Sequence, residues 1–232
     1  MVQINNLPYI PVRVRFRKVG DLQYISHLDL VRTMQRVAAR AKLPLWYTEG
    51  FNPKPKMVFG PPLSTGVESE CEFLDLRFTE RVDFEDVKRR LNENLTDSMK
   101  VYDIYIPESS LSDIFYFRYR ISLKCDEGAE YAVEKIREFL EREEINILKK
   151  SKKGEITVNI RPLVRVHSLS TDGDLAILDL VLDGSQTSFL NPENLVKAIK
   201  ENTDLLPEQR FATEYYTVMK LDAYREDMSR FN

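Results

Sequence analysis

The order of the predicted strands and helices constrains this chain most, because one order occurs twice. In the first half, "VRVRFRKV" (12–19) alternates apolar residues with arginine, which predicts a strand with one buried face. "SHLDLVRTMQRVAARA" then predicts a helix over 27–41, with Ser26 as its N-cap and Asp29 completing an acidic capping box. The other elements predicted for this half are strands at 43–48, 56–60, 70–78 and 99–106 and a helix capped by Asp83.

The second half repeats this order and adds a hairpin. The word "LDL" occurs at 74–76 and at 178–180, and a helix pattern follows each time, "VKRRLNEN" or "LVKAIKEN". The order strand, helix, strand, strand, helix, strand is that of a ferredoxin-like module. The elements predicted for this half are strands at 114–125, 161–169, 175–183 and 211–221, helices at 128–143 and 191–202, the latter capped by Asn191, and a hairpin at 145–160 that turns near Gly154.

We therefore predict an α+β protein made of two tandem ferredoxin-like (βαββαβ) modules that arose by internal duplication. The modules are expected at residues 1–108 and 109–232, because "PESSLSD" (107–113) has the composition of a linker.

The composition is that of an ordinary globular protein, with 43% hydrophobic and 31% charged residues. No apolar run approaches the roughly 20 residues that cross a bilayer, and the N-terminus lacks the basic start and apolar core of a secretory signal. We therefore expect a cytoplasmic protein that does not enter a membrane. Cys71 and Cys125 are too few for a disulfide framework, and their positions favour small buried hydrophobic residues over nucleophiles.

The net charge of -3 hides an uneven distribution. Residues 11–60 contain ten Lys or Arg and three Asp or Glu, a net charge of +7, so the rest of the chain carries -10. A basic lobe on an acidic protein suggests one face that attracts polyanions. The alternative is chance clustering of charges on a solvated surface.

Motifs for cofactors and metals are missing. The chain has neither GxGxxG nor GxxxxGK[ST], so no dinucleotide site or P-loop is indicated. Two cysteines and two histidines that lie far apart have no recognisable ligand spacing for zinc or an iron–sulfur cluster. We expect neither a metal nor a cofactor to be bound by this chain alone.

The first predicted helix carries two candidate features. His27 lies in its first turn, where the helix dipole favours a neutral imidazole that can accept a proton; the alternative is a purely structural residue beside the cap. Arg32, Arg36 and Arg40 are spaced by four and line one stripe, which would suit a phosphate backbone or, alternatively, plain solvent.

The segment "GFNPKPKMVFGPPL" (50–63) has a composition found nowhere else in the chain. Its prolines fix backbone torsions, so Lys54 and Lys56 are presented from a comparatively stiff loop. Trp46, Tyr47 and Phe51 lie close by, and aromatic planes beside cations are what single-stranded RNA uses for stacking and charge neutralisation. The alternative is that all three aromatic residues belong to the core.

The words "SHLDLVR", "GFNPKPK" and "GVESE" in residues 12–105, and more loosely "NIRPLV" at 159–164, resemble the radical-SAM-linked family, a domain of unknown function found beside or fused to radical SAM proteins. The resemblance implies a separate radical SAM partner that supplies the iron–sulfur cluster and S-adenosylmethionine. Lys54 stands where such proteins often have His or Arg. The residues that match the family's words are Ser26, His27, Asp29, Arg32, Gly50, Phe51, Asn52, Pro53, Pro55, Gly66, Glu68 and Arg161.

Three hypotheses of function follow. The first is an accessory RNA-binding module for a radical SAM enzyme that modifies RNA, with the arginine stripe, Trp46, Tyr47, Phe51, Asn52, Lys54, Lys56 and Arg161 as contact residues. The second is a metal-independent endoribonuclease that uses His27 as its base. The third is a protein-docking scaffold that uses residues 45–66 and binds no RNA.

Overall fold

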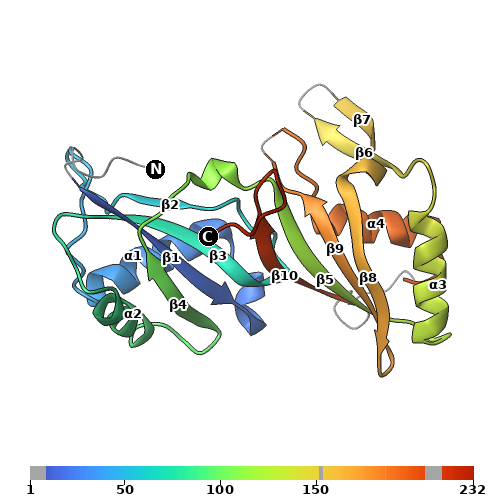
Figure 1. Cartoon of the computed structure of the whole chain (residues 1–232), viewed down its shortest axis with the longest axis horizontal. Helices are drawn as coiled ribbons and strands as arrows, with labels where there is room; N and C mark the ends of the chain where they lie inside the picture. Colours follow the sequence, from blue (N-terminus) through green and yellow to red (C-terminus); the bar gives the residue numbers. More distant parts are fainter. Residues whose placement is uncertain (1–8, 152–153, 186, 207–215) are drawn as a thin grey trace. The chain divides into compact units, whose positions relative to one another are not determined.

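The computed structural model describes residues 9–151, 154–185, 187–206 and 216–232, and the chain divides into two compact units (Figure 1). The first unit comprises the residues up to Asp113 together with Phe231 and Asn232, and the second runs from Ile114 to Arg230. Each unit is of mixed α+β class and contains an antiparallel sheet with two α-helices among its described residues. No helix in the described ranges combines the length and the apolar character that crossing a membrane requires.

The sheet of the first unit has the strand order β4-β1-β3-β2, and all three pairings are antiparallel. Apolar side chains of β1, such as Val14 and Phe16, share one core with Met34 of α1 and with Val87 and Leu91 of α2. The elements are β1 (Ile10–Lys18), the 3₁₀ turn η2 (Gly20–Tyr24), α1 (His27–Arg40), β2 (Met57–Phe59), β3 (Val67–Phe78), α2 (Phe84–Asn92), β4 (Met99–Tyr105) and η3 (Leu111–Asp113).

The two helices of this unit begin where their capping residues predict. The Ser26 side chain accepts a hydrogen bond from the backbone N–H of Asp29, and that of Asp83 accepts one from Glu85. Each cap satisfies a helix N–H that would otherwise lack a partner.

The expectation that β1 buries only one face is wrong. Arg13, Arg15 and Lys18 are buried, with relative exposures of 0%, 9% and 2%. The guanidinium of Arg15 lies over the rings of Phe73 and Tyr102, with distances of 5.9 and 5.3 Å to the ring centroids. Alternation of apolar and charged residues therefore identifies the strand, but it does not show that the charged face meets solvent.

Arg13 is the most completely buried of these cations. Its Nε and Nη2 atoms donate to the carboxylate of Asp75 at 2.7 and 2.9 Å, and Nη2 also donates to the carbonyl of Ser109 at 2.9 Å. The guanidinium carbon lies 4.8 Å from the centroid of the Phe231 ring. Phe231 also packs edge-on against Phe73, with 5.1 Å between the centroids. A buried charge of this kind is tolerated because these partners replace much of the lost hydration. Nη1 of Arg13 makes no hydrogen bond with a described residue.

The predicted strand at 43–48 is also wrong. This segment forms only isolated bridges, Leu45 with Phe78 and Tyr47 with Pro55. The neighbouring prediction at 56–60 is confirmed as β2, which pairs with β3 at the edge of the sheet.

The second unit has the strand order β10-β5-β9-β8. Numbered along the chain within this unit, these strands are the fourth, first, third and second of the sheet, which is the same order as β4-β1-β3-β2 in the first unit. An additional hairpin, β6 paired with β7, is inserted between α3 and β8. Part of the last predicted strand (211–215) and the hairpin turn (152–153) lie outside the described residues. The elements are β5 (Tyr116–Lys124), α3 (Ala129–Leu140), β6 (Asn146–Ser151), β7 (Gly154–Asn159), η4 (Arg161–Leu163), β8 (Val164–Asp172), β9 (Leu175–Asp183), α4 (Pro192–Asn202, capped by Asn191) and β10 (Tyr216–Tyr224).

Candidate functional site

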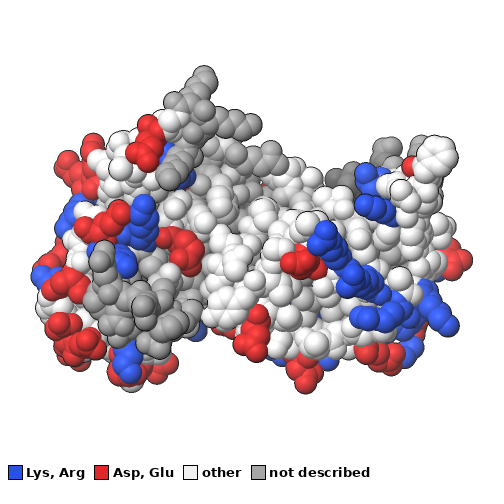
Figure 2. Space-filling model, turned by 180° about the vertical axis from the view of Figure 1, so that it is seen from behind, with Lys and Arg blue, Asp and Glu red and all other residues white. Residues whose placement is uncertain are grey.

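Helix α1 presents its three arginines to solvent. Arg32 is exposed and lies 3.4 Å from the carboxylate of Asp29, while Arg40 makes only a long contact of 3.5 Å to the carbonyl of Asn94. Arg36 has no hydrogen bond or ion pair with any described residue. Figure 2 shows a diagonal band of Lys and Arg on the back of the molecule. The three side chains, referred to below as the arginine row, therefore carry positive charge that the unit itself largely leaves uncompensated.

The N-terminus of α1 is closed by its own side chains. Ser26 Oγ accepts from the backbone N–H of Asp29 at 3.1 Å and donates to the Asp29 carboxylate at 2.7 Å. The hydrogen bond from Ser26, aided by Arg32, lowers the pKa of Asp29. Ser26 and Asp29 thus hold the start of the helix.

His27 is exposed and packs against an aromatic ring. Its imidazole meets Phe59 of β2 edge-on, with 5.6 Å between the ring centroids and 84° between the planes. No described side chain hydrogen-bonds to His27. The second residue of a catalytic pair, which would orient the imidazole as a general base, is therefore missing from the described ranges.

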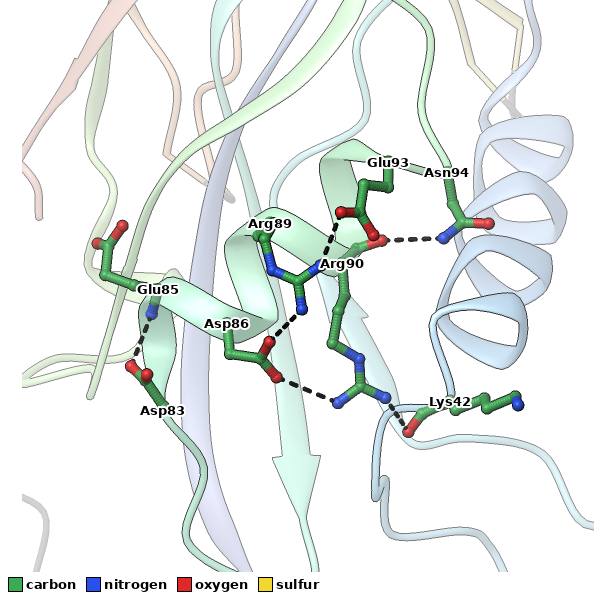
Figure 3. Close-up of polar contacts among 8 residues, drawn as sticks. All are labelled: Lys42, Asp83, Glu85, Asp86, Arg89, Arg90, Glu93 and Asn94. Carbon is green, nitrogen blue, oxygen red and sulfur yellow. Dashed lines mark hydrogen bonds and ion pairs between the residues drawn. The ribbon is translucent and has the colours of Figure 1, made fainter.

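The C-terminal end of α1 is fixed by α2 (Figure 3). Arg90 donates to the carbonyl of Lys42 at 2.5 Å and lies 3.4 Å from the Asp86 carboxylate. Arg89 bridges Asp86 and Glu93, at 2.5 and 2.6 Å. The hydrogen bond from Arg89 is the main reason that the pKa of Asp86 is lowered. The cations of α2 are thus paired internally, in contrast to the arginine row.

The proline-rich segment folds back on itself. The backbone N–H of Thr48 donates to the carbonyl of Lys54 at 2.9 Å, the N–H of Lys54 donates to Thr48 Oγ1 at 3.1 Å, and the N–H of Lys56 donates to the carbonyl of Trp46 at 3.0 Å. Gly50 near the turn has φ of 125°, a value that side-chain-bearing residues rarely adopt. Residues 46–56 therefore form a short arm, hereafter the arm.

Trp46 lies at the base of the arm. Its backbone N–H donates to the carbonyl of Arg77 at 2.7 Å, and its half-buried ring lies 5.8 Å from that of Tyr9. The guanidinium of Arg77 covers both rings, at 4.2 Å from Tyr9 and 5.6 Å from Trp46. This stack anchors the arm to β3.

The tip of the arm is bare. Phe51 is fully exposed, at 106% of the reference area, and Tyr47 is 44% exposed. Glu49, Asn52 and Lys54 are also exposed, and none of their side chains has a hydrogen bond or ion pair with a described residue. Glu49 was not among the candidate site residues predicted from the sequence. Its position next to Gly50 was the only feature of the sequence that could have placed it at the tip. Pro53 is exposed at the tip, while Pro55 and Lys56 are half-buried.

Three further residues from the sequence motifs make contacts outside the arm. Glu68 accepts a hydrogen bond from the backbone N–H of Gly20 at 2.6 Å, and Gly66, with φ of 89°, donates to the carbonyl of Gln23 at 2.9 Å. Both bonds hold η2 against the start of β3. Arg161 belongs to the second unit, where its side chain donates to the carbonyl of Val164 at 3.0 Å.

The second unit contains a polar groove of about 470 Å³ between α3 and the end of α4. Tyr131 donates to Asp204 at 2.9 Å and Arg142 donates to Asn202 at 3.1 Å across it. Lys135 also lines the groove. No local pattern in the sequence predicts this groove, because the residues that meet across it lie 60 and 73 positions apart.

The two cysteines differ in their surroundings: Arg15 Nη2 lies 3.7 Å from Cys71 Sγ, whereas the Cys125 thiol donates to the Glu127 carboxylate at 3.0 Å. Both thiols are buried. Burial, followed by the nearby Glu127, raises the pKa of Cys125 to about 11. No group of three or more His, Cys, Asp or Glu in the described part of the chain is placed to hold a metal ion.

No curated protein matches the chain. Among solved structures, it is similar to one described as "Crystal Structure of a Cbf5-Nop10-Gar1 Complex", with 10% sequence identity and a TM-score of 0.49. That similarity covers 93% of this chain and 50% of the other, so this chain spans about half the length of the matched one. A model of a protein family matches residues 12–192, and the family is described as "Uncharacterized protein conserved in bacteria (DUF2344)". The chain therefore belongs to this family of uncharacterised bacterial proteins.

Proposed function

We propose that this protein binds RNA through its first unit and serves as an accessory to a separate radical SAM enzyme that modifies the RNA. The arginine row carries this proposal. Its three cations share one face of α1, and Arg36 has no anionic partner among the described residues. Like charges in a row repel one another, and a phosphate backbone would relieve that repulsion while releasing its own counterions.

The exposed basic surface contains fewer cations than the net charge of residues 11–60 suggests. Arg13, Arg15 and Lys18 are buried and do not face a ligand in solvent. The exposed cations that remain on this stretch lie on or just after α1 and on the arm: Arg32, Arg36, Arg40, Lys42 and Lys54. The proposal therefore rests on α1 and the arm rather than on β1.

The test compares α1 with α2. In the variant Arg32→Gln/Arg36→Gln/Arg40→Gln, affinity for a fluorescent single-stranded RNA should fall, and the slope of log K against log salt should become shallower by about 2, since each phosphate contact contributes about 0.7. Arg89→Gln is the matched control, because Arg89 is held by two carboxylates of its own helix. Absent or salt-independent RNA binding by the wild-type protein would overturn the proposal.

The proposed radical SAM partner is supported by the sequence words "SHLDLVR" and "GFNPKPK". The partner would supply the iron–sulfur cluster and S-adenosylmethionine. Affinity purification from the native cell should recover such a protein, and nuclease treatment separates a direct protein contact from one bridged by RNA. Recovery of no radical SAM protein, with or without nuclease, would contradict this part of the proposal.

RNA cleavage by His27 is the alternative activity, and the exposure of its imidazole is the observation that favours it. Incubating the wild-type protein and His27→Ala with RNA in EDTA discriminates between RNA cleavage and RNA binding alone. We expect neither protein to cleave, because no described side chain orients the imidazole. Cleavage that is lost in the variant would replace the binding proposal with a nuclease.

We also infer that the two units are ferredoxin-like modules derived from one ancestor. The shared strand order supports this inference, as do two ion pairs at corresponding places. Asp75 and Asp179 are the central residues of the two "LDL" words. Arg13 lies opposite Asp75 and Arg120 lies opposite Asp179 on the neighbouring strand, and each arginine forms an ion pair with that aspartate. An alignment of family members should give profiles for residues 10–106 and 115–224 that match each other, and unrelated profiles would refute the duplication.

A further inference from the structure

The tip of the arm presents an aromatic ring with nothing to cover it. Phe51 is fully exposed, whereas phenylalanine is among the residues most often buried in folded proteins. Its neighbours at the tip are polar or charged, namely Glu49, Asn52 and Lys54, and all three are exposed. The ring therefore stands alone among groups that form hydrogen bonds.

The ring is held on a backbone that is already shaped. The hydrogen bonds between Thr48 and Lys54 close the arm behind it, and the Pro55–Tyr47 bridge and the Trp46 stack secure the base. The ring of Pro53 fixes its own φ angle on one side of the tip, and Gly50 on the other side permits the turn through its φ of 125°. A segment ordered in this way loses little conformational entropy when it binds a ligand.

The groups around the ring match the chemistry of a nucleobase. A planar aromatic side chain stacks on any base. A carboxylate such as that of Glu49 accepts a hydrogen bond from an exocyclic amino group, and an amide such as that of Asn52 both donates and accepts. Lys54 supplies positive charge for an adjoining phosphate.

We infer that the arm binds an unpaired nucleotide of RNA by stacking the base on Phe51, so that the substrate class is single-stranded RNA or the loop of a folded RNA. This inference rests on the proposed function, since it identifies the RNA that the arginine row attracts. A base within a duplex is stacked on its neighbours and does not offer its face to Phe51. An apolar protein pocket is a poorer match, because it would bury the carboxylate and the ammonium group beside the ring without partners.

The experiment uses the full chain and three probes: a single-stranded 12-mer of alternating adenosine and cytidine, whose bases carry exocyclic amino groups, a 12-base-pair RNA duplex and inorganic polyphosphate, which has charge but no bases. Phe51→Ala should weaken binding of the single strand by about 5- to 150-fold, the range for loss of one base–aromatic stack. The salt slope should not change, because no phosphate contact is lost. Affinities for the duplex and for polyphosphate should also stay the same.

Two further variants control the result. Phe51→Trp should keep or strengthen single-strand binding, because it retains an aromatic face. Tyr24→Ala removes another exposed aromatic ring, 52% exposed on η2, and should have no effect. Phe51 has no ring contact with a described residue, so its variants should have the melting temperature of the wild type.

The outcomes separate the two proposals. Suppose that RNA binding depends on the arginine row but that Phe51→Ala binds as tightly as the wild type. This result would overturn the stacking inference and leave the proposed function standing. Equal affinity of the wild type for the single strand, the duplex and polyphosphate would likewise overturn only the stacking inference. Absence of RNA binding by the wild type would overturn both.

Discussion

Arg13 and Asp75 face each other directly across β1 and β3 and form a two-pronged ion pair, with Nε–Oδ1 and Nη2–Oδ2 distances of 2.7 and 2.9 Å. The guanidinium is completely buried, while the carboxylate keeps 24% of its side-chain exposure. The second unit has a similar pair, in which Arg118 reaches Asp179 at 2.6 and 2.7 Å. There the carboxylate is the buried member, with 4% exposure.

Replacing Asp75 by Asn should destabilise the protein strongly. The substitution leaves the buried guanidinium of Arg13 without its counter-charge, and loss of one partner of a buried pair costs about 3 kcal/mol. Urea unfolding monitored by circular dichroism measures the change. Glu85→Gln is the control, because its pair with Lys88 lies on the surface and should contribute less than about 1 kcal/mol. Similar losses for the two variants would contradict the assigned role of Asp75.

Asp179 should make the protein sensitive to acid. Burial alone would raise the pKa of this carboxyl, but the hydrogen bonds and charge of Arg118 outweigh burial and hold the pKa below its ordinary value. The stabilisation is therefore complete above the ordinary pKa of about 4 and is lost as the pH falls through the lower folded-state pKa. Asp179→Asn should be less stable than wild type at pH 7, and the gap should narrow below pH of about 4. A gap that stays constant with pH would contradict this.

Both cysteines should resist alkylation in the folded protein. With a pKa of about 11, Cys125 is thiolate in about one molecule in a thousand at pH 8, and Cys71 is completely buried. Mass spectrometry after treatment with iodoacetamide should show little modification in buffer and complete modification of both residues in urea. Rapid labelling of Cys125 in buffer would show that its surroundings differ from those described.

Ser26→Ala should raise the pKa of Asp29 toward its ordinary value, because the hydrogen bond from Ser26 is the largest cause of its lowering. Carbon-detected NMR titration of the Asp29 carboxyl measures this pKa directly. The variant should also melt at a lower temperature, since an N–H of the first turn of α1 loses its acceptor. Ser26→Thr keeps a hydroxyl and should restore both properties; an unchanged Asp29 titration in Ser26→Ala would contradict the cap.

The starts of three helices were predictable because their signals are local. Ser26, Asp83 and Asn191 each cap a helix through a residue two or three positions further on, so a short window of sequence contains both partners. The burial of the charged side chains of β1 was not predictable from a short window of sequence. Arg13 depends on Asp75, Ser109 and Phe231, which are distant in sequence and whose pairing follows only from the complete unit.

The candidate site was found only in part for a related reason. The spacing of Arg32, Arg36 and Arg40 fixes their shared face once α1 exists, so the arginine row was predictable. Trp46 and Phe51 could not be told apart, because both are aromatic residues near the same prolines. Trp46 is held at the base of the arm by Tyr9 and Arg77, and Phe51 is left bare at its tip. This difference arises from contacts with β3 and with the N-terminal segment.

Phe231 has a consequence for how the protein is made. The ring that covers Arg13 belongs to the first unit, yet residues 114–230 lie between it and the rest of that unit in sequence. A ribosome adds about 5–20 residues per second, so Arg13 leaves the exit tunnel on the order of ten seconds before Phe231 is made. During synthesis, the Arg13 guanidinium of the first unit therefore remains without the Phe231 ring over it until the second unit has been translated.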